Sequence, residues 1–335
     1  MRIGIAGVGF MGSTHAAGWA ATDAELVGFS AETPQEAQDL AAQYGARVFE
    51  DFEVMLDEVD VVDICVPTHL HAPLTILAAK RGKHVICEKP LARTVDEAKE
   101  MIAVCKAAGV QLFVAHVVRF FPEYASAKAV VDQGQIGRVA TARYMRGSYR
   151  PKKPVGNWFL DEAKSGGILL DLMIHDLDYA RWIGGEVESV LARKVSTAHP
   201  DSPIDYGMVI LTHRSGAISH VAGAWAYPPP TFRTGFEISG DQGMIEFDSQ
   251  SAAPIESLLA KPTGDAPDVG LPASPVAESP YTTQIKEFYA ALTTGSPVRV
   301  SAADGLAAVQ IALAAVESAR SGQAVFIKDL AEVVA

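Results

Sequence analysis

The stretch Arg2-Ile3-Gly4-Ile5-Ala6-Gly7-Val8-Gly9-Phe10-Met11-Gly12 decides the fold. Its apolar start is typical of a buried strand, and a Gly-x-Gly-x-x-Gly pattern follows at once. We expect Gly7 to permit a tight turn, Gly9 to let the backbone approach a pyrophosphate, and Gly12 to let the next helix pack closely on the sheet. Amides at the start of that helix, around Phe10 and Met11, would face the phosphates. The pattern therefore predicts a dinucleotide site.

The rest of the amino-terminal third alternates short apolar runs with amphipathic segments. Two of these segments begin with a predicted capping box, at Thr33-Pro34-Gln35-Glu36 and at Thr94-Val95-Asp96-Glu97. Repeated strand–helix winding predicts a Rossmann domain over residues 1–120, with a doubly wound parallel sheet that binds ligands at the carboxyl ends of its strands. The expected strands are residues 3–6, 26–29, 61–66, 84–87 and 111–115.

Residues 121–335 follow a different pattern, which predicts an α+β domain with an open, mainly antiparallel sheet. Arg214-Ser215-Gly216 and Gly240-Asp241-Gln242-Gly243 are short enough for hairpins. We expect a loop over 148–159, a helix over 170–182, and a proline-punctuated connection from Pro262 to Pro280. Late helices over 281–293 and 301–320 could pack back on the first domain. The expected strands are 187–195, 206–213, 217–225, 232–239 and 244–248.

Length, charge and cysteine usage narrow the class of protein. A chain of 335 residues is long enough for two hydrophobic cores. Its net charge of −12 favours neither a nucleic acid nor an anionic membrane as partner. The three cysteines show no metal-ligand spacing and predict buried reduced thiols and no metal site, which fits a cytoplasmic protein. We expect no signal peptide, and no apolar run long enough to span a bilayer.

The end of the second strand bears on cofactor choice. An acidic residue is expected there to hold a ribose hydroxyl, but Ser30 and Ala31 occupy the expected contact point and Glu32 comes one place late. Without a nearby arginine for a 2′-phosphate, the choice between NAD and NADP stays open. The negative charge of Glu32 favours NAD.

Candidate residues follow two later strands of the sheet. Lys89, in Glu88-Lys89-Pro90, should project into the cleft, where a lysine can polarise a hydroxyl or carbonyl oxygen; the competing interpretation is a surface lysine at a strand end. His69 and His71 follow the strand ending at Val66 and could contact the cofactor.

Asp171 and His175 lie four residues apart, so a continuous helix would place them on one face, with Asp178 continuing it. A histidine held by a carboxylate is a competent general base near neutral pH. Gly166-Gly167 would let a ligand approach the backbone. The competing interpretation is a solvated polar stripe. For His15, His199, His213 and His220 the sequence offers no convergent partners, which favours structural or exposed roles.

Taken together, these motifs resemble the Gfo/Idh/MocA oxidoreductases, the family of glucose-fructose oxidoreductase and inositol dehydrogenase. The resemblance covers nearly the whole chain. It rests on the glycine pattern, on Pro67-Thr68-His69-Leu70-His71, on the run from Gly82 to Pro90, and on Gly166-Gly167 with Asp171, His175 and Asp178. It implies that Lys89 lies by the nicotinamide and substrate, that Asp171 and His175 complete the catalytic group, and that the second sheet builds a homodimer or homotetramer. Ala31 and His116 depart from the family pattern.

These observations predict an NAD(P)-dependent dehydrogenase that acts on a secondary alcohol of a sugar or cyclitol. We expect cofactor contacts from Gly7, Gly9, Phe10, Met11, Gly12, Ser30, Ala31, Pro67, Thr68, His71, Glu88 and Lys89, and substrate contacts from His116, Arg119, Tyr149 and Trp158. Aromatic faces suit the C–H faces of sugar rings. Two alternatives stay open: an NAD-dependent glycoside hydrolase of the same fold, and a non-catalytic nicotinamide-binding regulator.

Overall fold

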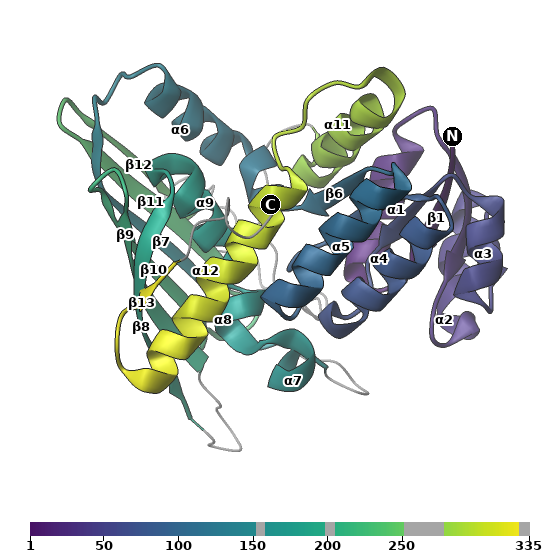
Figure 1. Cartoon of the computed structure of the whole chain (residues 1–335), viewed down its shortest axis with the longest axis horizontal. Helices are drawn as coiled ribbons and strands as arrows, with labels where there is room; N and C mark the ends of the chain where they lie inside the picture. Colours follow the sequence, from purple (N-terminus) through teal and green to yellow (C-terminus); the bar gives the residue numbers. More distant parts are fainter. Residues whose placement is uncertain (152–157, 198–204, 251–277, 328–335) are drawn as a thin grey trace. The chain divides into compact units, whose positions relative to one another are not determined.

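The computed structural model describes residues 1–151, 158–197, 205–250 and 278–327. The chain divides into two compact units (Figure 1). Unit 1 comprises the described residues of Met1–Pro122 and Ser274–Val309, and unit 2 those of Glu123–Ala273 and Gln310–Val333. The proline-punctuated connection predicted before Pro280 lies largely outside the described residues.

Unit 1 is built on a six-stranded parallel sheet in the order β3-β2-β1-β4-β5-β6. The order reverses between β1 and β4. Because strand–helix–strand crossovers are right-handed, the helices that follow β1 and β4 cover opposite faces of the sheet. The predicted doubly wound sheet is confirmed. Its strands are β1 (Arg2–Ala6), β2 (Glu25–Ser30), β3 (Arg47–Phe49), β4 (Val61–Ile64), β5 (His84–Glu88) and β6 (Leu112–Ala115).

The helices of unit 1 come from both ends of the chain. Helices α4 and α5 pack together, and α11 packs on α1 (Figure 1). Ile285 and Phe288 of α11 are fully buried in the same core as Trp19 of α1. The helices are α1 (Phe10–Ala20), α2 (Pro34–Tyr44), α3 (Phe52–Glu58), α4 (His71–Lys80), α5 (Val95–Ala108) and α11 (Pro280–Thr294), with short 3-10 turns η1 (Thr68–Leu70) and η2 (Val117–Phe120).

The two predicted capping boxes have different outcomes. Thr94 accepts a hydrogen bond from the Glu97 amide while Glu97 reaches back to the Thr94 amide, so this box is confirmed. At Thr33 the prediction was wrong, because among the described residues the threonine side chain makes no capping hydrogen bond. Pro34 still starts α2 at its first helical position, where its missing N–H costs nothing.

Unit 2 contains a seven-stranded mixed sheet in the order β12-β11-β7-β10-β9-β8-β13. Among the strands that the structure describes here, only the β7–β10 pair is parallel, so the expected mainly antiparallel sheet is confirmed, including both hairpins. The interior strand β7 was missed, because its ten residues mix charged, glycine and apolar positions. The strands are β7 (Val139–Ser148), β8 (Val187–Ser196), β9 (Asp205–His213), β10 (Ile218–Trp225), β11 (Arg233–Gly240), β12 (Met244–Asp248) and β13 (Val325–Phe326).

Helices α8 and α9 pack on this sheet. The expected single helix over 170–182 was wrong, because the helix is interrupted at Leu172–Met173. Met173 instead fills the space that side chains at Gly207 and Gly223, paired on β9 and β10, would occupy. The helical elements here are α6 (Pro122–Asp132), η3 (Trp158–Leu160), α7 (Glu162–Ser165), α8 (Gly167–Asp171) and α9 (Ile174–Gly184); α12 (Ala302–Ser321) has residues in both units.

Helix α12 also corrects the expectation about apolar runs. The helix has 20 residues and contains an 18-residue window with a mean hydropathy of 1.3, so it is long and apolar enough to cross a bilayer. However, 56% of this window is buried inside the protein, and a buried core helix can have the same length and hydropathy. Length and composition therefore give weak evidence for a membrane span.

Candidate active site

The glycine loop between β1 and α1 has the conformation that its sequence predicts. Gly7 has a φ of +93°, and a Cβ added to it would lie 2.5 Å from the carbonyl oxygen of Cys65. A Cβ on Gly12 would lie 2.0 Å from the Gly7 oxygen. Both positions therefore require glycine, one for the turn and one for close packing of the helix.

The amino terminus of α1 suits an anion. Gly9 is its N-cap and offers no side chain, and the first turn carries no acidic residue. The first amides of a helix have no intrahelical acceptor and point outward, so a phosphate can accept hydrogen bonds from them. Gly9 and Phe10 are exposed. This cradle fits the pyrophosphate of a dinucleotide.

Two neighbouring strand ends add candidate cofactor contacts. The Gly7 amide donates to the Ser30 carbonyl at 2.8 Å, which fixes the end of β2 beside the loop. Ala31 is half-buried and Glu32 exposed. After β4, Pro67 precedes η1, and the buried Thr68 hydroxyl has no hydrogen-bond partner among the described residues. An unpaired buried hydroxyl is costly, so Thr68 is the residue here that most needs a ligand atom.

The turn Glu88-Lys89-Pro90 closes β5 at the same carboxyl edge of the sheet as the glycine loop. The Lys89 amide donates to Glu88 Oε2 at 3.0 Å, and Lys89 is half-buried. His71 lies under the turn, with Nδ1 2.7 Å from the Pro90 oxygen and Nε2 2.9 Å from the Val66 oxygen. Burial lowers the pKa of His71. A neutral imidazole carries one N–H and donates to only one of these two main-chain oxygens, and either bond supports this turn. Contact of His71 with the cofactor stays a prediction.

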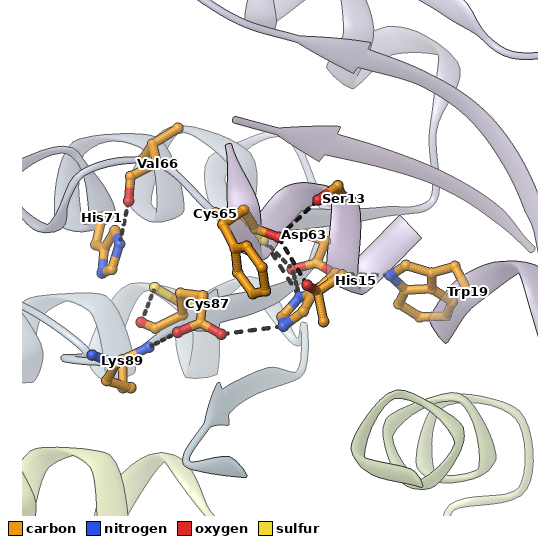
Figure 2. Close-up of polar contacts among 12 residues, drawn as sticks. Ser13, His15, Trp19, Asp63, Cys65, Val66, His71, Cys87 and Lys89 are labelled. Carbon is orange, nitrogen blue, oxygen red and sulfur yellow. Dashed lines mark hydrogen bonds and ion pairs between the residues drawn. The ribbon is translucent and has the colours of Figure 1, made fainter. Parts of the chain in front are cut away.

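One group that the sequence analysis missed lies behind this edge. His15 of α1 is fully buried, with Nδ1 2.9 Å from Asp63 Oδ2 (Figure 2). Its Nε2 lies 3.1 Å from Glu88 Oε1. We expected a structural or exposed role for His15 without charged partners. The signal that could have located its partner is Asp63, a charged residue within the otherwise apolar strand Val61–Ile64.

In unit 2, the proposed acid–base residues lie on two helices. Asp171 is the last residue of α8 and His175 is in the first turn of α9, so the predicted shared face of one helix was wrong. The Leu172 and Met173 amides both donate to the Ile168 carbonyl, which widens the turn between them. Asp171 and Asp178 are buried and His175 is half-buried, so the alternative of a solvated stripe fails.

A buried ion pair fixes the start of α9 on the sheet. Asp176 accepts two hydrogen bonds from Arg146 of β7, at 2.7 and 3.0 Å, and both residues are at most 3% exposed. The sequence analysis did not identify Arg146, because β7 was not recognised as a strand. The pair anchors the helix that carries His175.

The predicted substrate contacts lie in varied surroundings. Arg119 is buried, donates to the Arg299 carbonyl at 2.7 Å and forms an ion pair with Asp304 at 3.4 Å. Much of its guanidinium is therefore occupied by contacts within unit 1. His116 is the buried N-cap of η2. Tyr149 is buried just after β7, and Trp158 stacks on Phe159 with ring centroids 4.0 Å apart. Substrate contact by these residues stays a prediction.

The three cysteines are free thiols, as expected. Cys87 and Cys105 are buried and Cys65 is half-buried. Burial raises the pKa of each thiol, to about 11 for Cys105. They therefore remain protonated near neutral pH and are poor nucleophiles.

Comparison with known proteins agrees with this geometry. Residues 1–116 match the family described as "Oxidoreductase family, NAD-binding Rossmann fold", and residues 124–246 match the GFO/IDH/MocA C-terminal domain. Levoglucosan dehydrogenase of Pseudarthrobacter phenanthrenivorans is 31% identical, over 95% of this chain and 96% of its own. Inositol 2-dehydrogenase of Rhizobium meliloti is 30% identical, also over 95% of this chain and 96% of its own.

Solved structures agree over a similar extent. GenD2 from gentamicin A biosynthesis, in complex with NAD, superposes with a TM-score of 0.87 at 26% identity, covering 98% of this chain and 97% of that one. Levoglucosan dehydrogenase in complex with NADH and levoglucosan gives a TM-score of 0.84 at 27% identity, covering 98% and 100%.

Proposed function

Because the chain belongs to the Gfo/Idh/MocA family of oxidoreductases, with an NAD-binding Rossmann domain, we propose that it oxidises a secondary alcohol of a sugar or cyclitol. The observation that carries this proposal is the shared carboxyl edge of unit 1. There the glycine loop after β1, Thr68 after β4 and Lys89 after β5 are gathered by strand order alone. The glycine loop, which suits a dinucleotide phosphate, thus lies at the same edge of the sheet as Lys89, whose amine can polarise an alcohol oxygen.

The proposed roles of the side chains follow from their chemistry. The His175 imidazole takes the proton of the substrate hydroxyl, and Asp171 orients the imidazole and stabilises its cation. The Lys89 ammonium polarises the oxygen and positions it. NAD, when bound at the glycine loop, accepts the hydride from the carbon. His116, Arg119, Tyr149 and Trp158 are proposed to hold the rest of the sugar ring.

A spectrophotometric screen of inositols, aldoses and anhydro-sugars with NAD and NADP tests this function. We expect NADH formation with at least one polyol, and loss of turnover in Lys89→Ala and His175→Ala with NADH binding retained. Lys99→Ala and His84→Ala, at partly exposed positions outside the proposed site, serve as matched controls. Near-normal rates in both site variants would refute the assignment. Cleavage of a glycoside without net NADH formation would indicate hydrolysis instead.

We further propose that the chain forms a homodimer or homotetramer through the open face of the unit 2 sheet. Exposed apolar side chains alternate along β8 and β9, and the register pairs Leu191 with Ile210 and Val195 with Tyr206 on one face. Met208 and Ile218 extend this apolar surface. Large exposed apolar patches mark interfaces. Light scattering should show an oligomer that Ile210→Asp dissociates; a wild-type monomer would contradict the proposal.

A cytoplasmic location and an absence of nucleic-acid and membrane partners remain our expectations for this acidic chain. Fractionation of cells into soluble and membrane pools tests the membrane part, because α12 has the length of a span. Recovery of the active enzyme in the membrane pool would contradict it.

A further inference from the structure

A buried charged cluster joins three elements of unit 1 behind the proposed site. His15 of α1 lies between two carboxylates, with Nδ1 3.0 and 2.9 Å from the two oxygens of Asp63 on β4 and Nε2 3.1 Å from Glu88 Oε1 on β5. The Trp19 indole N–H donates to Asp63 Oδ2 at 2.8 Å (Figure 2). His15 and Asp63 are fully buried and Glu88 is 5% exposed.

This arrangement favours a positively charged imidazole. Ionised carboxylate oxygens only accept hydrogen bonds, so a proton on each ring nitrogen makes both contacts to the carboxylates attractive. Burial is the largest single influence and opposes the charge on His15, but the interactions with Asp63 and Cys65 together raise the pKa of His15 well above its usual value. The contact to Glu88 is within ion-pair distance, although its angles fall outside those of a good hydrogen bond.

A metal ion is the competing explanation. The ligand atoms of His15, Asp63 and Cys65 all lie within 4.8 Å of one another. However, hydrogen bonds account for these short distances, and the Trp19 N–H already occupies one Asp63 oxygen. The geometry therefore favours an imidazolium over a metal ligand.

We propose that His15 is a positioning residue, whose imidazolium locks Glu88 and thereby fixes the direction of Lys89. Glu88 uses its two oxygens for different partners: Oε1 pairs with His15, and Oε2 accepts the main-chain N–H of Lys89. His15 lies on the helix that begins at the glycine loop, so the same cation also ties α1 to β4 and β5. The proposal rests on the function proposed for Lys89.

The charge state can be measured on the wild-type protein, independently of activity. In ¹⁵N-labelled histidine spectra we expect one imidazole with both nitrogens protonated at pH 8, where an ordinary histidine is neutral. Its ring protons should show through-space contacts to the Trp19 indole proton, because both groups bind Asp63 Oδ2. A neutral His15 at pH 8, or a stoichiometric metal ion in the purified protein, would overturn the proposal.

A double-mutant cycle tests whether His15 acts through Glu88. We expect His15→Gln and Glu88→Gln each to lower kcat about tenfold with the Kd for NADH changed less than threefold, and the double variant to be no worse than the poorer single variant. Independent effects would multiply to about a hundredfold loss and would overturn the proposal. His84→Gln, on the same strand but outside the cluster, is the matched control.

These outcomes separate the inference from the proposed function. If Lys89→Ala retains full activity while His15 is an imidazolium, the proposed role of Lys89 fails and the positioning role fails with it, although the charged cluster stands. If Lys89→Ala is inactive but His15 is neutral or the cycle is additive, only the positioning role fails.

Discussion

Replacing Gly7 by alanine should lower the free energy of unfolding and weaken cofactor binding. Two features of the structure contribute to the loss of stability. The φ of +93° disfavours any L-residue, which costs about 1–2 kcal/mol of unfolding free energy. In addition, the new Cβ would lie 2.5 Å from the Cys65 carbonyl oxygen. Because that atom belongs to the backbone, no side-chain rotation relieves the contact, and overpacking adds about 1–3 kcal/mol.

Gly45→Ala is the matched control, because Gly45 has a φ of +63° but no atom of the described residues lies within 4 Å of an added Cβ. Gly45 ends α2, and β3 begins two residues later, so it lies at the amino edge of the sheet, opposite the edge that carries the glycine loop. Urea denaturation should show a loss of about 1–2 kcal/mol for Gly45→Ala and about 2–5 kcal/mol for Gly7→Ala.

Cofactor binding should separate the two variants more clearly. Relief of the contact at Gly7 displaces the loop by about 1 Å, and displacements of that size cost up to about a hundredfold in activity. Titration of NADH by fluorescence should therefore show at least tenfold weaker binding for Gly7→Ala and unchanged binding for Gly45→Ala. Equal stability and equal NADH affinity in the two variants would refute this reasoning.

Three further outcomes are expected. Thr68→Val should weaken NADH binding about three- to tenfold in titrations without destabilising the cofactor-free protein, because the lost hydroxyl has no partner among the described residues; unchanged affinity would exclude a cofactor contact. Arg146→Ala should cost about 3–5 kcal/mol in urea denaturation by leaving Asp176 buried and unpaired, whereas Arg143→Ala, which removes an exposed pair, should cost about 1 kcal/mol or less; equal losses would contradict this. Because the pKa of His15 is raised on folding, the protonated imidazole stabilises the fold fully below its unfolded pKa of about 6.5. This stabilisation is lost as the pH rises through the folded pKa. Unfolding free energies measured at increasing pH should therefore show the loss in the wild type and not in His15→Gln.

The sequence predicted unit 1 well because its local signals agree with one another. An apolar strand, a glycine pattern and a helix start follow within twelve residues, and each limits the conformation of the next. The Thr33 box failed although its residues are the right ones, since a cap also depends on the side-chain rotamer.

Less of unit 2 and of the site could be predicted, because long-range packing decides them. The interruption between α8 and α9 depends on Met173 meeting Gly207 and Gly223, which lie more than thirty residues away in the sequence. The partners of His15 follow from strand order rather than from sequence spacing. Spacing alone placed Asp171 and His175 on one face of a single helix, whereas the structure places them on two helices, α8 and α9.

The place of α11 in the first core has a consequence for biosynthesis. Phe288 stacks on Phe113 with ring centroids 5.1 Å apart, and Ile285 fills the space above Gly18. The Rossmann core therefore stays incomplete until the ribosome has passed the codon of Phe288, long after it has translated the strand Arg2–Ala6. A truncated product that stops at residue 122 would expose this apolar surface, which makes it a natural substrate for chaperones.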